Sequence, residues 1–153
     1  MTSSQSTVAA MAAGRPVLGV SVSVWRGDEV LLVRRGREPS KGLWSPVGGK
    51  VEFGESLEAA ARREVAEETG VDCEILGFST LRELIMPDGA GGVRGHVVLA
   101  VFGARWLAGE ARAGDDADAV AWVAADRLED RPLVAGVVPY ILGTRRLTGG
   151  AQP

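Results

Sequence analysis

The segment from Gly48 to Val71 most constrains what this chain can fold into. Its sequence is GGKVEFGESLEAAARREVAEETGV. Ser56 is a favourable N-cap residue and Gly70 a favourable C-terminal stop, so the pattern predicts a helix from Leu57 to about Thr69. Such a short helix with so many carboxylates needs something that balances their mutual repulsion.

The carboxylates of this helix fall on the side that should pack inward. At about 100° per residue, with Leu57 taken as zero, Glu64 falls at about 340°, Glu68 at about 20° and Glu67 at about 280°. The small apolar residues of the helix share this arc, with Val65 at about 80°. Glu64 and Glu68 are four residues apart, and like charges at that spacing destabilise a helix, the more so when they are buried.

Spacing alone leaves two interpretations open. In the first, this is a charged surface helix with the ion pairs Glu58–Arg62 and Arg63–Glu67. In the second, the carboxylates hold a divalent cation, since hard oxygen ligands suit Mg²⁺ or Mn²⁺, which also bind phosphate oxygens.

The same segment resembles the signature of the Nudix hydrolase superfamily. Gly49, five residues, Glu55 and seven residues precede REVAEETGV, which matches that signature at each fixed position. The flanking segments VLLVRRGREPSKGLW and AGDDADAVAWVAADRLEDRPL are also similar, most of all to small bacterial ADP-ribose pyrophosphatase-like members. One position departs, because Val47 stands where members commonly have proline and Pro46 comes one place earlier. We expect a local change in the loop there.

The resemblance implies roles for particular residues. The implied metal ligands, for Mg²⁺ or Mn²⁺, are the Gly48 carbonyl, Glu64, Glu67 and Glu68. The implied catalytic residues are Arg63, Glu64, Glu67 and either Asp115 or Asp116. Glu55 and Arg63 would hold the carboxylates in place through salt bridges, and Gly49 would let the backbone approach the cation.

The reaction implied is hydrolysis of a nucleoside diphosphate linked to another group, most simply ADP-ribose or a similar nucleotide sugar. Bound cations would neutralise the diphosphate and lower the pKa of the attacking water. The general base stays open between Glu67 and an aspartate at 115 or 116, with Glu67 preferred because the motif fixes its position. The lone Cys73 has no evident partner base, so a covalent nucleophile is a poor alternative.

Substrate contacts are expected from the loop RRGREPSKGLWSPVGG, which is irregular and locally basic. Arg37 or Lys41 could bind a terminal phosphate. Trp44 and Phe53 could stack on a nucleobase, although a tryptophan next to a core strand is more often there for packing. His96, the only histidine, is assigned to packing at a strand edge.

The remaining pattern predicts a Nudix-type α/β/α sandwich with a mixed central sheet. Strands at Val17–Trp25 and Glu29–Arg34 should form a hairpin around Gly27. Further strands are expected in VDCEILGFSTLRELIM, in a run that begins close to His96, and in AVAWV. A helical turn in AADRLED should precede a last helix in VAGVVPYILGTRRL, kinked by Pro139. We divide the chain into a flexible tail (1–14), a single domain (15–147) and a flexible end (148–153).

Composition limits the partners. The chain is 46% hydrophobic and 24% charged, with a net charge of -3, so it has no electrostatic reason to bind nucleic acid or a membrane. We expect a cytoplasmic protein with a small-molecule nucleotide substrate, and a homodimer stays open. Two alternatives to the diphosphatase are a nucleoside triphosphate pyrophosphohydrolase, which would clean the nucleotide pool, and a non-catalytic nucleotide-sensing module.

Overall fold

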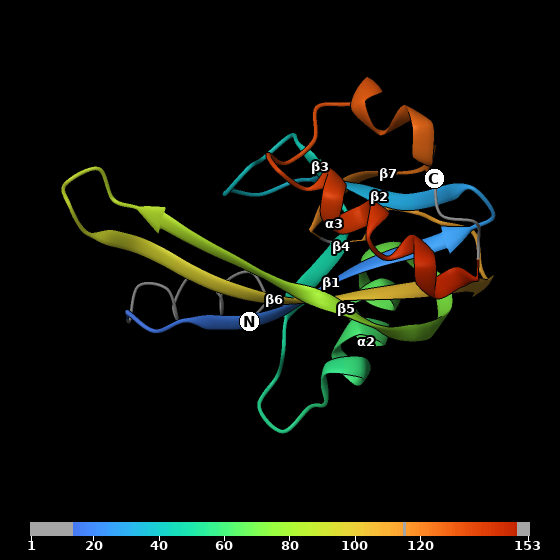
Figure 1. Ribbon diagram of the computed structural model, residues 1–153, viewed down its shortest axis with the longest axis horizontal. Coiled ribbons are helices and arrows are strands. Elements are labelled where there is room, and N and C mark those ends of the chain that lie inside the picture. Colours follow the sequence, from blue (N-terminus) through green and yellow to red (C-terminus); the bar gives the residue numbers. More distant parts are fainter. Residues whose placement is uncertain (1–13, 115, 150–153) are drawn as a thin grey trace.

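The computed structural model describes residues 14–114 and 116–149 (Figure 1). Its strands are β1 (Val17–Arg26), β2 (Glu29–Arg35), β3 (Trp44–Ser45), β4 (Val47–Lys50), β5 (Asp72–Pro87), β6 (Val93–Ala108) and β7 (Ala117–Ala124). The helical elements are α2 (Leu57–Thr69), the 3₁₀ helix η1 (Ala125–Asp130), α3 (Val138–Leu142) and the 3₁₀ helix η2 (Arg145–Thr148).

The strands form one mixed sheet in the order β3-β2-β1-β6-β5, with β4 also paired to β1 and β7 to β2. β1 runs parallel to β6 and antiparallel to β2 and β4. The predicted hairpin is confirmed, since Trp25 pairs with Val30 across a turn in which Gly27 has a φ of 58°. The strand predicted to begin close to His96 starts earlier, at Val93, because β6 continues with β5 into a long two-stranded ribbon (Figure 1).

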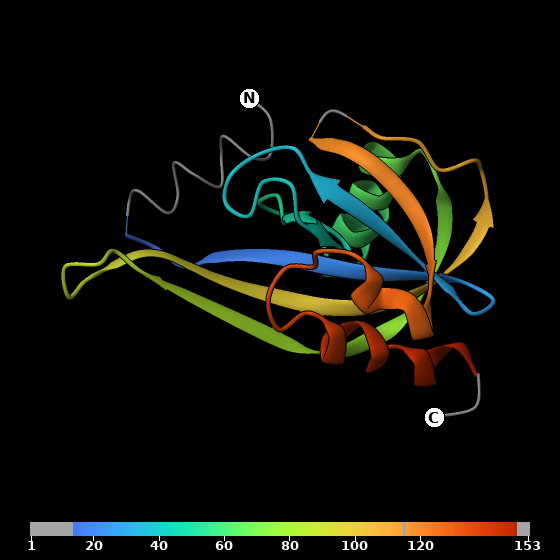
Figure 2. The same cartoon turned by 90° about the horizontal axis from the view of Figure 1, so that it is seen from above.

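Helices cover both faces of the sheet, as Figure 2 shows, with α2 on one face and α3 and η2 on the other. Successive side chains of a strand point to opposite faces, so β1 contributes to two cores. Val20, Val22 and Val24 pack in the core beneath α2, whereas Trp25 packs in the core beneath α3. The α2 face therefore carries the carboxylate helix, and the α3 face is separate from it.

The helix α2 begins and ends where the sequence predicts. The Ser56 Oγ accepts a hydrogen bond from the Ala59 N–H at 3.1 Å, and Gly70 closes the helix with a φ of 71°.

The C-terminal prediction of one helix kinked by Pro139 is wrong. α3 has only five residues and carries Pro139 in its first turn, a position that needs no backbone N–H donor, and η2 follows as a separate element. No helix in the described part of the chain is long and apolar enough to span a bilayer.

Candidate metal centre

The glycine pair of β4 forms a cradle for a carboxylate of α2. β4 pairs with β1, which places Gly49 opposite Val20. A Cβ atom on Gly49 would lie only 2.2 Å from the carboxyl carbon of Glu64. A Cβ atom on Gly48 would lie 2.7 Å from the Val20 carbonyl oxygen. Only glycine therefore lets the Glu64 carboxylate rest directly on this strand.

Arg63 connects the carboxylates around the cradle. Its Nε and Nη2 donate to the two oxygens of Glu55 at 2.8 and 2.9 Å. Its Nη1 donates to Glu64 at 2.8 Å and to Glu67 at 3.3 Å, and Nη2 also donates to the Lys50 carbonyl at 3.0 Å. These bonds raise the pKa of Arg63 and lower the pKa of Glu55. One guanidinium thus ties the loop before α2 to the helix itself.

The surroundings of two carboxylates of α2 disfavour their charged form and raise their pKa values. Glu64 is 1% exposed, and its burial raises its pKa despite the bond from Arg63. Burial and the nearby charges of Glu64 and Asp116 raise the pKa of Glu68 to about 7, and Arg35 opposes this only partly. A site with excess negative charge at this position favours a cation.

The loop before β7 brings Asp116 to the same site. The backbone N–H groups of residues 112 and 114 donate to the last carbonyls of α2 at 2.9 and 2.8 Å, which fixes the loop against the helix end. The Asp116 carboxylate lies 2.8 Å from the Nε of Arg37, and its backbone carbonyl accepts from the Gly36 N–H at 3.2 Å. Asp115, the other aspartate predicted as a base, lies outside the described residues.

Arg35 is a site residue that the sequence reasoning missed. It is the last residue of β2, and its Nε donates to the Pro39 carbonyl at 2.7 Å. Burial lowers its pKa, while the charges of Glu68 and Asp116 act in the opposite direction. The sequence did contain a signal for it. Arg34 and Arg35 lie at the end of a predicted strand, and because side chains alternate along a strand, one of the two must point to the face that the helix covers.

The predicted substrate residues do not all reach the site. Arg37 and Lys41 lie in the exposed loop between β2 and β3, and Phe53 is fully exposed in the loop before α2. Trp44 is only 7% exposed and packs in the core beneath α3, with the Arg131 guanidinium 4.5 Å from its ring centre. This burial favours the packing role for Trp44 over the stacking role. His96 lies on β6 and contacts Glu83.

The chemistry of the donor set fits a hard divalent cation. Within residues 14–114 and 116–149, no group of three or more Asp, Glu, His or Cys side chains is already arranged to hold a metal ion. The Arg63 Nη1 lies within ion-pair distance of both Glu64 and Glu67. The crowded carboxylates and the glycine cradle are the oxygen-rich, negatively charged surroundings that Mg²⁺ and Mn²⁺ prefer.

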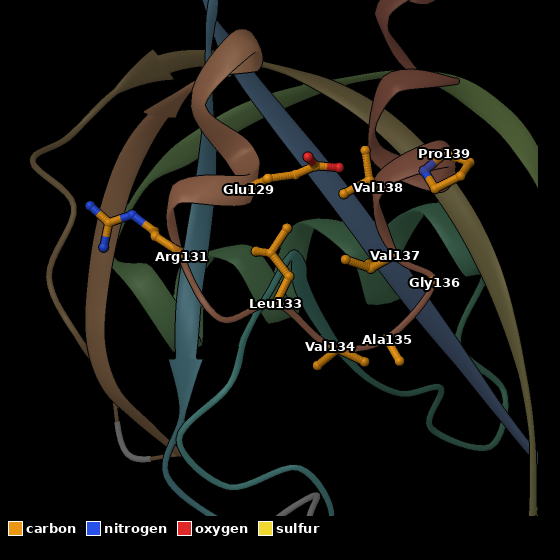
Figure 3. Close-up of a pocket in the computed structure, with 9 residues that line it drawn as sticks. All are labelled: Glu129, Arg131, Leu133, Val134, Ala135, Gly136, Val137, Val138 and Pro139. Carbon is orange, nitrogen blue, oxygen red and sulfur yellow. The ribbon is translucent and has the colours of Figure 1, made fainter.

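A separate hollow of about 410 Å³ lies on the α3 face, between η1 and α3. Its walls are mainly the aliphatic segment 133–139, with Glu129 and Arg131 at one side. In Figure 3 the Glu129 side chain reaches towards Val138, Arg131 points away, and α2 lies behind the strands. This hollow contains none of the carboxylates of α2.

Comparison with known proteins agrees with this geometry. A family model described as "NUDIX domain" matches residues 15–141. An ADP-ribose pyrophosphatase of Methanocaldococcus jannaschii is 38% identical over 102 residues, which are 67% of this chain and 58% of that protein. The chain thus spans little more than half the length of that relative.

Two further similar proteins are matched over more of their own length. A Mycobacterium tuberculosis protein named "Putative 8-oxo-dGTP diphosphatase 2" is 33% identical over 136 residues, 86% of this chain and 90% of that protein. The crystal structure of a MutT NUDIX hydrolase from Burkholderia pseudomallei superposes with a TM-score of 0.68 at 32% identity, covering 83% of this chain and 96% of that one. The matched segment, the fold and the arrangement of the carboxylate helix together show that this chain belongs to the NUDIX family, among relatives that are named as hydrolases.

Proposed function

We propose that the chain hydrolyses the diphosphate linkage of ADP-ribose or a similar nucleotide sugar, with Mg²⁺ or Mn²⁺ as its cofactor. The observation that carries this proposal is the pair Glu64 and Glu68. Glu64 is buried against Gly49, Glu68 is half-buried, and the positive charge around Glu68 is too small to keep its pKa at the usual value. The resemblance to an ADP-ribose pyrophosphatase over 102 residues supports the substrate class.

Glu64 and Glu68 would hold the cation, with the Gly48 carbonyl and Glu67 as further ligands. When bound, the cation would neutralise the diphosphate and lower the pKa of a water molecule. Arg63 positions Glu64 and Glu67 through the bonds described above.

Glu67 is our preferred base for the proton of the attacking water, since its side chain is more than half exposed and can reach solvent. Asp116 is the alternative base, with Asp115 as its neighbour in sequence. The Arg37 guanidinium already forms an ion pair with Asp116, at 2.8 Å. A substrate phosphate is also an anion, so it would compete with Asp116 for Arg37. Lys41 and Phe53 would contact the remainder of the substrate from exposed loops.

A nucleoside triphosphate pyrophosphohydrolase is the second candidate. The likeness to the M. tuberculosis protein favours it, because that alignment covers 90% of the relative. A purely sensing module has less support, since every carboxylate of the motif is present. For either enzyme, a small nucleotide substrate and the free, buried Cys73 suit a cytoplasmic location.

Product analysis tests the proposal. ADP-ribose and a panel of nucleoside triphosphates are incubated with the enzyme and Mg²⁺ or Mn²⁺. AMP and ribose phosphate are the expected products, whereas a nucleoside monophosphate with pyrophosphate would establish the second candidate. Glu68→Gln is the control and should abolish turnover. Absence of turnover on every nucleotide would favour the sensor and overturn both hydrolase proposals.

The same assay identifies the base. Glu67→Gln should lower kcat by about 10²-fold or more if Glu67 takes the proton. Asp116→Asn and Asp115→Asn should then retain most of the activity, and the reverse pattern would assign the base to the aspartate loop. Titration of Mn²⁺ with each variant separates loss of a base from loss of a metal ligand.

A further inference from the structure

β5 leaves a long sheet edge open. Among the described residues, its only partner in the sheet is β6. From Thr80 to Met86 it pairs with residues 95–101 without a register shift. No backbone hydrogen bond of the described residues, apart from that ladder, involves residues 80–86. In an antiparallel pair the outward N–H and C=O groups of such a strand are available to another strand.

An apolar surface accompanies this edge on the α2 face of the sheet. The strand register places Leu81 beside Ala100, Ile85 beside His96 and Phe78 beside Phe102. On β1, which lies beyond β6 from this edge, Leu18 pairs with Val98 on the same face. We call the four exposed apolar side chains the ribbon patch: Leu18 (45% exposed), Phe78 (49%), Leu81 (57%) and Ile85 (54%). A patch of this kind beside an open edge marks an interaction surface.

The open edge and the sequence of β5 together specify the occupant. Free backbone groups in a row select an extended strand, not a helix or a lipid surface. A two-fold axis at Glu83 would pair residues whose numbers sum to about 166, because antiparallel partners run in opposite directions. Leu81 of one copy then lies opposite Ile85 of the other, and Ile85 opposite Leu81, on one face. The strand is thus complementary to itself.

One pair of like charges along the edge opposes this pairing, and the other positions do not. Glu83 of the two copies would face each other, and each is already contacted by its own His96 at 3.2 Å. On the opposite face Arg82 is turned inward, 8% exposed, and donates to the Ala135 carbonyl at 2.6 Å. It would stand opposite Leu84, so no arginine pair would meet across the interface.

We propose that two copies of this chain associate through antiparallel pairing of their β5 edges, with the ribbon patches forming one apolar surface across the interface. The association does not depend on the proposed hydrolysis, so failure of either leaves the other intact. Leu107 provides a matched control, because it is 50% exposed on β6 and belongs to no part of the patch.

Analytical ultracentrifugation of the full chain tests this inference. The chain mass of 16.0 kDa should appear doubled for the wild type at about 100 µM. Ile85→Lys should weaken dimerisation at least about 10-fold, and Leu107→Lys should leave it unchanged. Circular dichroism verifies that both variants fold. Hydrogen exchange should show slow outward amides within residues 80–86 in the wild type and fast ones in Ile85→Lys.

A wild-type monomer at this concentration would overturn the inference, as would equal weakening by both lysine variants. Protected amides at 80–86 in a monomer would show that another segment of the same chain covers the edge, which also contradicts the proposed pairing.

Discussion

Arg63 and Glu68 show how two residues on one helix can have opposite electrostatic effects. Arg63 forms ion pairs with Glu55, Glu64 and Glu67 at once. Among the described residues, it forms no ion pair with Glu68. Glu68 therefore retains a charge that its surroundings oppose, and its pKa rises to about 7. Such a residue lowers the stability of the metal-free protein. It is expected at a binding site, because a bound cation would stabilise its charged form.

This imbalance predicts how the metal-free protein responds to pH. The folded state keeps a proton on Glu68 at pH values where the unfolded chain has already lost it. The free energy of unfolding should therefore fall as pH rises from about 5 to about 8, passing through the pKa of about 7. Because Glu68 is partly exposed, its contribution should be on the order of 1 kcal/mol. Urea unfolding in a chelator at several pH values measures it.

Glu68→Gln is the test of that assignment. The variant should flatten this part of the pH dependence and be as stable as the wild type or slightly more stable at pH 8, since it removes the repulsion with Glu64. An unchanged slope in the variant would mean that Glu64, whose pKa is also raised, causes the effect.

At the scale of elements, the sequence was most informative where local rules act alone. The span of α2 follows from its periodicity and its caps, and both ends are confirmed. The β1–β2 hairpin follows from its turn glycine in the same way. Local rules failed for α3, where Pro139 starts a helix, and for Asp116, whose place beside α2 depends on loop contacts with the helix end. Such contacts join residues far apart in sequence, so no local pattern indicates them.

The N-cap of α2 gives a prediction at this scale. Ser56→Ala removes the acceptor of the Ala59 N–H and should lower the free energy of unfolding by about 1 kcal/mol. Ser45→Ala serves as a comparison, because within the described residues the Ser45 Oγ donates only to the adjacent Pro46 carbonyl, at 3.1 Å. Thermal unfolding of the two variants should differ accordingly. Equal melting temperatures would show that the cap contributes nothing measurable.

For the whole molecule, the sheet separates the carboxylates of α2 from the core beneath α3. Family membership and the mixed sheet with helices on both faces are confirmed by the matched domain and the similar solved structure. The burial of Trp44 could be expected from the sequence only as the commoner outcome, because a tryptophan beside a basic loop suits both packing and stacking. Its environment depends on the segment after η1, where the Trp44 N–H donates to the Pro132 carbonyl at 2.8 Å.

Thr144 provides the test of this division. It is fully buried on the α3 face, accepts from the Trp25 Nε1–H at 2.9 Å and donates to the Ile141 carbonyl at 2.7 Å. Thr144→Val keeps the shape but leaves the buried Trp25 Nε1–H without its acceptor, while the Ile141 carbonyl keeps the Thr144 backbone N–H at 3.1 Å. The free energy of unfolding should therefore fall by about 1–3 kcal/mol. At temperatures where the variant is folded, kcat should stay near that of the wild type, because the carboxylates lie across the sheet. Glu68→Gln should show the opposite pattern, with little loss of stability and loss of turnover. A large fall in kcat for Thr144→Val would mean that the two faces are coupled.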